Sequence, residues 1–458
     1  MNHFVKISIV ILTLLMYTPT LTSGGIPRTM YVLNNSAETL SKLNLETAVI
    51  TMDLLTVGQI PNQIAIHDDL LYVINSGTDD IMVVNPRSDR RLLKTIALPE
   101  GSNPWFIAFP DETTAYVTNW LANTVSVIDL ETDEIVHDIE VGIAPQGILI
   151  YENRAFVANS GYSGWGAPYA TGTVSIIDTG TDSVIHTINV PTNVQDFAVD
   201  PLGRIHAICT GDYFSSFGAV TIIDLHTGPG GDVPAAIDTI HVGGSPGDIA
   251  ISNNGKGYCI AWGDGAYGHL YSYDALTHAI LHDATDPIRV GPNVSRIAYD
   301  TKENVLWIPT MTSYGGDGFV QKYDVISDSI IWQSGVLGSG SYDLAILEPI
   351  NDVTIGVDDE WHPDPALAVE LMQNYPNPFN PQTKIGYRLK YNQNIRLTIS
   401  NQRGQLVKTL VNDYVIAGYH ETTWDGTNSD NEYVSSGIYF YQLKTSTAQK
   451  AKRLIILR

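Results

Sequence analysis

Tyr116-Val117-Thr118-Asn119, followed by Val125-Ser126-Val127-Ile128-Asp129, is the sharpest copy of a pattern that occurs seven times between residues 31 and 323. In each copy a short strand that begins with an aromatic or similar residue precedes an alternating apolar strand and a turn. Aligned on that first position, the copies begin at Tyr31, Tyr72, Tyr116, Phe156, His206, Tyr258 and Trp307. Self-similarity at a spacing of about 40–50 residues indicates stacked copies of one supersecondary unit.

Each copy holds four strand signals. In the second copy these are residues 72–75, 81–84, 92–96 and 104–109. Apolar residues alternate along them, and Gly, Pro, Asn or Asp stand at their ends, which is the signature of strands joined by hairpins. The pattern therefore predicts a four-stranded antiparallel sheet for each copy.

One turn is repeated in all the copies. After the second strand come Asn44, Asn85, Asp129, Asp178, Asp224, Asp274 and Asp324. Three residues later come Thr47, Ser88, Thr132, Thr181, Thr227, Thr277 and Ser327. An Asn or Asp that opens a turn can accept a hydrogen bond from the backbone two residues on, and Ser or Thr can close it. We therefore predict that these carboxylates are structural.

The two ends of the array complement each other. The first copy starts directly at its Tyr31 strand and lacks the strand that precedes every other copy. A matching strand, residues 341–346, follows the last copy. One sheet should therefore take three strands from the N-terminus and one from the end of the array, which hides the open edges. The sequence predicts an all-β, seven-bladed β-propeller over residues 26–348.

These residues resemble the YVTN-type β-propeller repeats of bacterial and archaeal surface proteins. The resemblance covers Tyr31 to about Glu348 and is strongest in the Tyr116 and Phe156 copies. It is weaker from His206 to Trp307, where the Tyr-Val-x-Asn motif is lost. The resemblance implies a protein of the cell surface.

The N-terminus has the pattern of an export signal. Lys6 is followed by an almost wholly apolar stretch, residues 7–17, and then by small residues up to Gly24. We expect a signal peptide over residues 1–23, cleaved near Ser23. The apolar stretch is shorter than the roughly 20 residues that span a bilayer, and no other such stretch exists, so we expect no transmembrane span in the mature chain.

The C-terminal quarter should form a separate domain. Residues 349–370 are acidic and contain proline, which is typical of a linker. Residues 371–458 contain six strand signals separated by turns. A small antiparallel β-sandwich, similar to an Ig domain, is the natural prediction.

This region resembles the type A C-terminal sorting domain of the type IX secretion system. The most distinctive motif follows Asn374 and comprises Tyr375, Pro376, Asn377, Pro378, Phe379, Asn380 and Pro381. Trp424-Asp425-Gly426 and a basic, apolar C-terminus complete the likeness. The resemblance implies export through the outer-membrane secretion machinery, followed by surface anchoring or release. The alternative is an accessory Ig-like module with no sorting role.

Charge and cysteine content exclude some functions. The net charge is −24, with 49 acidic and 25 basic residues, so a nucleic-acid partner is not expected. Cys209 and Cys259 lie on the same strand of neighbouring copies but two positions out of phase. They are poorly placed for a disulfide, and we expect two buried thiols.

Polar residues should converge where the innermost strands meet near the propeller axis. The candidates for this axial channel are Gln63, Trp105, Asp196, Asp248, Arg296 and Asp343. Such a group could bind a divalent cation or a polar ligand. The alternative is a water-filled channel with a solvated polar mouth.

Four consecutive copies carry enlarged loops after their first strand, and all four should emerge on one face. The loops are rich in aromatic residues, Gly and Asp. Their candidate ligand-binding residues are Tyr162, Trp165, Tyr169, Tyr213, Phe214, Trp262, Tyr267 and Tyr314. Aromatic loops on one rim favour a recognition surface for a glycan, a flat organic ligand or a protein. The alternative is that these side chains only pack on one another.

Signals of catalysis are weak. The sequence contains no H-E-x-x-H, G-x-S-x-G or P-loop motif, and no cofactor can be identified. We therefore expect a secreted or surface-bound binding or scaffold protein. A lactonase-like hydrolase or lyase that uses the axial carboxylates, with a divalent cation, is the alternative. By resemblance, capture of cobalamin at the cell surface is a second alternative, and a surface-layer component is a third.

Overall fold

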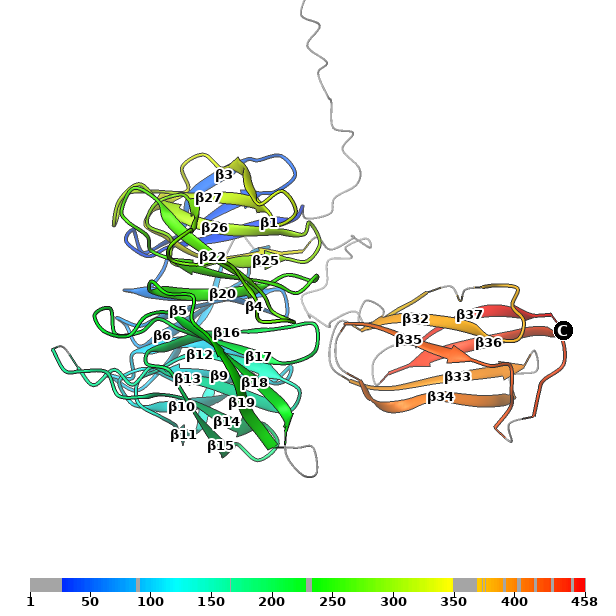
Figure 1. Cartoon of the computed structure of the whole chain (residues 1–458). Helices are drawn as coiled ribbons and strands as arrows, with labels where there is room; N and C mark the ends of the chain where they lie inside the picture. Colours follow the sequence, from blue (N-terminus) through cyan, green and yellow to red (C-terminus); the bar gives the residue numbers. More distant parts are fainter. Residues whose placement is uncertain are drawn as a thin grey trace, which may run out of the picture. The chain divides into compact units, whose positions relative to one another are not determined.

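Seven antiparallel sheets arranged around one axis account for the repeated strand patterns in the computed structural model (Figure 1). The structure describes residues 27–457 except 88–90, 165, 228–232, 349–368, 373, 375, 390–392, 402–404, 416–417, 430–431 and 446–448. The chain divides into two units, residues 1–355 and 356–458. The predicted signal peptide and almost all of the predicted linker lie outside the described residues.

The sheets follow one another along the chain, and we number them as blades 1 to 7. Blade 1 contains β1 (Thr29–Asn34), β2 (Thr39–Asn44), β3 (Ile50–Thr56) and β30 (Ser341–Leu347). Blade 2 contains β4 (Pro61–His67), β5 (Leu70–Asn75), β6 (Asp80–Val84) and β7 (Leu92–Ala97). Blade 3 contains β8 (Pro104–Ala108), β9 (Thr114–Asn119), β10 (Thr124–Asp129) and β11 (Glu134–Glu140). Blade 4 contains β12 (Pro145–Tyr151), β13 (Arg154–Asn159), β14 (Gly172–Asp178) and β15 (Ser183–Val190).

The remaining blades have the same order. Blade 5 contains β16 (Val194–Val199), β17 (Ile205–Cys209), β18 (Ala219–Thr227) and β19 (Val233–Ile240). Blade 6 contains β20 (Pro246–Ile251), β21 (Lys256–Ala261), β22 (Gly268–Asp274), β23 (Ile280–His282) and β24 (Ile288–Val290). Blade 7 contains β25 (Ala298–Asp300), β26 (Val305–Met311), β27 (Asp317–Asp324), β28 (Ser329–Gln333) and β29 (Gly338–Ser339). In blades 6 and 7 the outermost strand is split into two short pieces that pair with the same neighbour.

The predicted closure is confirmed. Strand β30 pairs antiparallel with β1, so that Tyr31 lies opposite Ala345. Blade 1 therefore contains three N-terminal strands and one strand from the end of the array, and Figure 1 shows β1 among the last strands of the propeller. The innermost strands β30, β4, β8, β12, β16, β20 and β25 follow one another around the ring. Strands β26 and β27 of blade 7 contact β30, so the ring has no open end.

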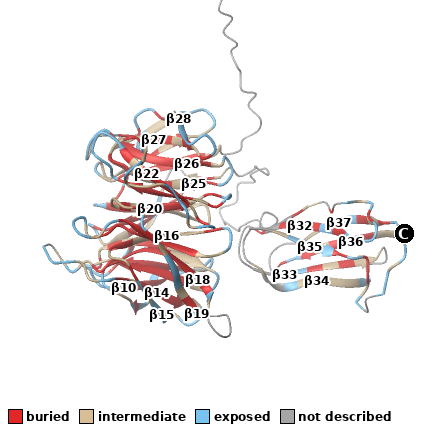
Figure 2. Ribbon diagram, in the orientation of Figure 1, coloured by how far each residue is buried: buried red, intermediate tan, exposed pale blue. Residues whose placement is uncertain are grey.

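The hydrophobic core lies between neighbouring blades. One cluster joins Tyr31 and Leu33 of blade 1 to Leu71 and Val73 of blade 2, and all four side chains are buried. Equivalent clusters fill the other interfaces, whereas the outermost strands are largely exposed (Figure 2). Cys209 and Cys259 are buried free thiols in two of these clusters, as predicted.

The predicted turn is also confirmed. The side-chain oxygen of Asp129 accepts hydrogen bonds from the backbone N–H groups of Glu131 and Thr132, at 2.8 and 3.0 Å. The same bond to the residue two positions on is made by all seven opening residues: Asn44, Asn85, Asp129, Asp178, Asp224, Asp274 and Asp324. The repeated carboxylates therefore shape turns.

The C-terminal unit contains two antiparallel sheets. One has the order β31 (Val369–Leu371), β32 (Thr383–Leu389) and β35 (Gly418–Trp424). The other has the order β34 (Leu406–Val415), β33 (Gln393–Asn401), β36 (Gly437–Lys444) and β37 (Gln449–Ile456). Trp424 is fully buried in the core of this unit, and its Nε1 donates to the carbonyl oxygen of Thr427 at 2.9 Å.

The proline-rich motif of this unit is attached to its last strand. The backbone N–H of Phe379 donates to the carbonyl oxygen of Ile455, and the side-chain oxygen of Asn377 accepts from the N–H of Ile455. Phe379 is 2% exposed. Tyr375, the first residue of the motif, lies outside the described residues. No helix within the described part of either unit is long and apolar enough to cross a membrane.

Candidate functional site

The innermost strands place polar side chains beside the axis, where they link neighbouring blades. Gln63 on β4 accepts a hydrogen bond from the backbone N–H of Ile107 in the next blade, at 2.7 Å. Asp248 on β20 accepts from the N–H of Ile297, at 2.9 Å, and Asp343 on β30 accepts from the N–H of Ile64, at 3.0 Å. These three axial candidates therefore satisfy backbone donors across blade boundaries.

Arg296 lies in the segment before β25 and reaches across the axis. Its Nη1 lies 3.3 Å from Oδ2 of Asp196, which belongs to blade 5. Its guanidinium carbon lies 4.5 Å from the ring centroid of Phe106 in blade 3 and 5.7 Å from that of Tyr342 in blade 1. The Arg296 side chain is 10% exposed, so a charged group from blade 7 is enclosed by side chains of three other blades.

Burial and one guanidinium act in opposite directions on the axial carboxyl groups. Burial raises the pKa of Asp196 and of Asp248, and the Arg296 guanidinium acts in the opposite direction for both. Burial likewise raises the pKa of Asp343 to about 6, again opposed by Arg296. A raised pKa means that the folded protein favours the protonated carboxyl groups. Burial therefore opposes the charged form of all three carboxyl groups, and the Arg296 guanidinium favours it.

The axial residues do not form a metal site in the structure. No group of three His, Cys, Asp or Glu side chains in the described part of the chain is arranged to hold a metal ion. The guanidinium of Arg296 lies among the axial carboxylates, where a cation would have to bind. The hydrogen bonds that Gln63, Asp248 and Asp343 accept join neighbouring blades.

The sixth axial candidate, Trp105, belongs to an aromatic wall and not to the charged group. Its ring lies 5.4 Å from that of Trp120, which stacks on Tyr162 with centroids 5.0 Å apart. Tyr162 in turn contacts Tyr169 at 5.5 Å. Two of the predicted ligand-binding residues therefore use part of their ring surface in contacts with each other and with Trp120. Trp120 is not among the predicted site residues, although it directly follows the Tyr-Val-Thr-Asn motif.

The other loop aromatics are exposed. Every large aromatic side chain that is exposed in the described part of the propeller lies on one of three consecutive loops, in blades 5, 6 and 7. These residues, with their exposed fractions, are Tyr213 (56%), Phe214 (90%), Phe217 (60%), Trp262 (39%), Tyr267 (45%) and Tyr314 (82%). We call this set the aromatic rim. Trp165, a further candidate, lies outside the described residues.

The rim loops are held in shape by their own carboxylates. Oδ1 of Asp212 accepts hydrogen bonds from the backbone N–H groups of Phe214, Ser215 and Ser216, at 2.7 to 2.9 Å. Asp264 does the same for Ala266 and Tyr267, at 2.9 Å each. The rings of Phe214 and Tyr267 are therefore presented to solvent on ordered turns, which lowers the entropy lost when a ligand binds.

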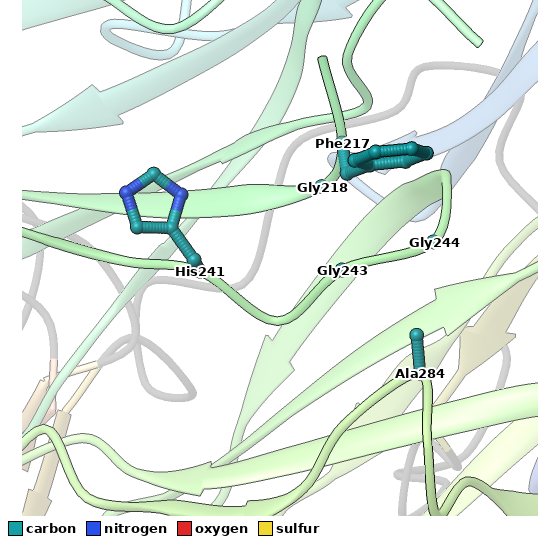
Figure 3. A pocket seen from close by; sticks show the side chains of 6 residues that line it. All are labelled: Phe217, Gly218, His241, Gly243, Gly244 and Ala284. Atoms are coloured by element: carbon teal, nitrogen blue, oxygen red, sulfur yellow. The ribbon is translucent and has the colours of Figure 1, made fainter. Parts of the chain in front are cut away.

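A pocket of about 520 Å³ opens beside the rim, between blades 5 and 6. Its lining residues are Phe217, Gly218, His241, Gly243, Gly244 and Ala284. Figure 3 shows the Phe217 ring and the Ala284 methyl group on either side of the Gly243–Gly244 turn, with the imidazole of His241 at one end. This pocket is not recognisable from the sequence, because its residues come from three separate loops.

Comparisons with known proteins support the fold of both units. The model of the FlgD Ig-like domain family matches residues 380–449. A hydrazine synthase structure from Kuenenia stuttgartiensis is 17% identical and superimposes with a TM-score of 0.50, covering 65% of this chain and 99% of that one. A quinonprotein alcohol dehydrogenase-like protein from Bacteroides thetaiotaomicron is 10% identical with a TM-score of 0.50, covering 70% and 78%. At these identities the likeness concerns the fold alone. No curated protein matches the sequence.

Proposed function

We propose that this chain is an exported β-propeller binding protein that recognises its ligand through the aromatic rim. One observation carries the proposal: the exposed aromatic side chains of the described propeller gather on three consecutive loops of one face. Exposed apolar groups that cluster, and do not occur singly, mark interaction sites. Tyr, Trp and Phe supply a large contact area at a small loss of side-chain entropy.

A binding role agrees better with the geometry than catalysis at the axis. Asp248, Asp343 and Gln63 are engaged by backbone donors of neighbouring blades. Arg296 is enclosed between aromatic rings and Asp196. A lactonase-like reaction would need carboxylates that are open to a substrate or cation, and these groups are instead committed to holding the ring together.

We further propose that the chain leaves the cell through the type IX secretion system. The support is the apolar N-terminal stretch, the Ig-like C-terminal unit and the motif from Asn374 to Pro381, which is attached to the last strand. Deletion of residues 371–458 in a host with this secretion system should leave the propeller inside the outer membrane. Normal delivery of the truncated chain would instead identify the C-terminal unit as an accessory module.

Ligand binding through the rim can be tested by thermal unfolding of the full chain with a panel of glycans, corrinoids, quinones and divalent cations. A ligand at a hundred times its Kd stabilises the folded state by about 2.7 kcal/mol. A triple variant with Phe214→Ala, Tyr267→Ala and Tyr314→Ala should abolish the shift. A matched control is Leu202→Ala with Ile326→Ala, because these side chains are 67% and 79% exposed on turns at the opposite face.

The panel also separates the alternatives. A ligand-induced thermal shift that is still seen in the triple variant but is absent in Asp248→Asn would place the ligand at the axis. This result would contradict the rim proposal. A shift with corrinoids that needs the rim would identify cobalamin capture. Turnover of a lactone that is lost in Asp196→Asn would establish an enzyme in place of a binding protein.

A further inference from the structure

We propose that the pocket at Phe217, Gly243 and Gly244 binds one sugar ring of a neutral polysaccharide. This inference rests on the rim function proposed above and names its ligand class. The pocket has three elements that suit a sugar ring: a floor of glycine backbone and one methyl group, an aromatic wall and a polar end. Its volume of about 520 Å³ falls within the usual range of small-molecule sites, roughly 300–1,000 Å³.

The floor contains two glycines whose positions do not tolerate a side chain. A Cβ atom on Gly244 would lie 2.1 Å from Oη of Tyr271, a buried side chain. A Cβ atom on Gly243 would lie 2.9 Å from the Ala284 methyl group, and both glycines have a positive φ. The pocket therefore presents bare backbone and one methyl group, a surface against which a ring can lie flat.

The wall and the polar end supply complementary contacts. The Phe217 ring is 60% exposed beside the turn, so one of its faces is open to a ligand. The C–H groups on one face of a sugar ring are apolar and pack against an aromatic face. The exposed imidazole of His241 lies at the end of the pocket, where it can exchange a hydrogen bond with a sugar hydroxyl group.

The charges around the pocket disfavour an anionic ligand. The carboxylates of Asp212 and Asp283 lie on loops that line it, and both are engaged in their own turns. The guanidinium of Arg289 is held over the ring of Tyr267, at 5.1 Å from the centroid. A phosphate or carboxylate ligand would therefore meet negative charge in a chain with a net charge of −24, and among the described residues that line the pocket only His241 carries a basic group.

A cationic ligand would find no direct ion-pair partner either, because none of the described residues that line the pocket carries a carboxylate. The oxygens of Asp212 and Asp283 already accept hydrogen bonds from backbone and side-chain donors. A cation would gain only weak, solvent-screened attraction. A neutral ligand is the class that the charge distribution leaves, and the pocket supplies ring contact and hydrogen bonding for it.

The neighbouring rings extend the surface for a chain of sugars. Trp262 and Tyr314 lie on adjacent loops of blades 6 and 7, with ring centroids 6.4 Å apart. A polysaccharide with one ring in the pocket can continue along these exposed side chains. Contact at several rings raises the overall affinity although each contact is weak.

The test is affinity electrophoresis of the full chain in native gels. Each gel contains one soluble neutral polysaccharide, such as mixed-linkage β-glucan, xylan, galactomannan or starch, or one anionic polysaccharide, polygalacturonate or heparin. We expect retardation in at least one neutral gel and in none of the anionic gels. Phe217→Ala and Ala284→Leu, which remove the wall and fill the floor, should each weaken retardation about tenfold.

The matched control is Phe214→Ala, which removes a more exposed ring from the same loop without altering the pocket. It should weaken retardation by less than Phe217→Ala. Melting temperatures of all variants, compared with that of the unmodified chain, distinguish lost binding from lost folding. If the Phe217→Ala variant does not fold, retardation of the Ala284→Leu variant tests whether the pocket binds the polysaccharide.

Two results would overturn the inference. In the first, retardation by a neutral polysaccharide is unchanged in both pocket variants but lost in the triple variant of Phe214, Tyr267 and Tyr314. This result would refute binding in the pocket and leave the rim function intact. Absence of retardation in every neutral gel refutes the ligand class. The rim function itself fails only if the triple variant also leaves every ligand-induced thermal shift unchanged.

Discussion

Arg28 and Glu348, 320 residues apart in the sequence, are joined by a hydrogen bond of 3.0 Å between Nε and Oε1. The same guanidinium contacts Asp300 of blade 7 at 2.8 Å and Glu303 at 2.8 Å. Asp300 also accepts a hydrogen bond from Nε1 of Trp307. One arginine thus joins the residues before β1, the residues after β30 and the neighbouring blade, at the point where the ring closes.

Loss of this arginine should weaken the closure. Arg28→Ala would leave the carboxylate of Asp300, whose side chain is 1% exposed, without its cation. Removing one partner of a buried pair typically costs about 3–5 kcal/mol, and the partial exposure of Arg28 reduces our expectation to roughly 2–4 kcal/mol. Urea unfolding of the full chain should show this loss in the propeller transition.

A matched control is available at the same place. Lys302 also pairs with Glu348, but its side chain is 56% exposed. Lys302→Ala should therefore change stability by less than about 1 kcal/mol. Equal effects of the two variants would contradict a special role for Arg28 in closure.

The axial carboxyl groups predict a dependence of stability on pH. Burial raises the pKa of Asp343 to about 6, above its ordinary value of 3.8. A group with a raised folded-state pKa contributes stability below its unfolded pKa, and this contribution is lost as the pH rises through the folded value. Asp343→Asn, whose amide oxygen can still accept the N–H of Ile64, should therefore be more stable than the unmodified chain at pH 8. The difference in stability between the two proteins should shrink as the pH falls from 7 to 4.

The quantity to measure is the difference in stability between Asp343→Asn and the unmodified chain at each pH, because other groups titrate in the same range. Burial lowers the pKa of His206, so its contribution is lost as the pH falls through 6.5, with the opposite sign. This contribution cancels when Asp343→Asn is compared with the unmodified chain by thermal melts at each pH. A constant difference from pH 4 to 8 would show that Asp343 titrates normally.

The fold was predictable because its determinants are local and repeated. The turn at Asp129 needs only a carboxylate and the next three residues, and the closing strand at residues 341–346 carries the same alternation as its counterparts. The polar axis was predictable from register, since Asp196, Asp248 and Asp343 occupy equivalent positions of the innermost strand.

The contacts among site residues were not predictable in this way. Arg296 reaches Asp196 and Phe106 across the axis, and their separation in space depends on the radius of the closed ring. The stacking of Tyr162 on Trp120 likewise joins loops of different blades. The pocket required three loops to meet around Gly243 and Gly244, whose importance lies in the missing side chains and not in a motif.

The packing of the C-terminal motif gives a further prediction. Phe379 is 2% exposed and lies 5.5 Å from the ring of Trp424. Phe379→Ala should destabilise the C-terminal unit by about 3–5 kcal/mol, as is usual for a buried Phe. Chemical unfolding should show this in the transition of that unit and leave the propeller transition unchanged. Leu406→Ala, at a side chain that is 55% exposed, is the control and should have little effect on either.

The effect of loop rigidity on ligand binding can be tested separately from the effect of the aromatic side chains. The hydrogen bonds from Ser215 Oγ and from the backbone N–H groups of Ser216, Phe214 and Ser215 lower the pKa of Asp212, which shows that the loop favours the charged carboxylate. Asp212→Ala removes these acceptors but no ring. We expect weaker ligand binding, because Phe214 must then be ordered at the moment of binding, and an unchanged melting temperature, because the turn is at the surface. Asp212→Asn, which keeps one acceptor oxygen, should recover part of the affinity. If Asp212→Ala binds as tightly as the unmodified chain, preorganisation of this loop contributes nothing to recognition.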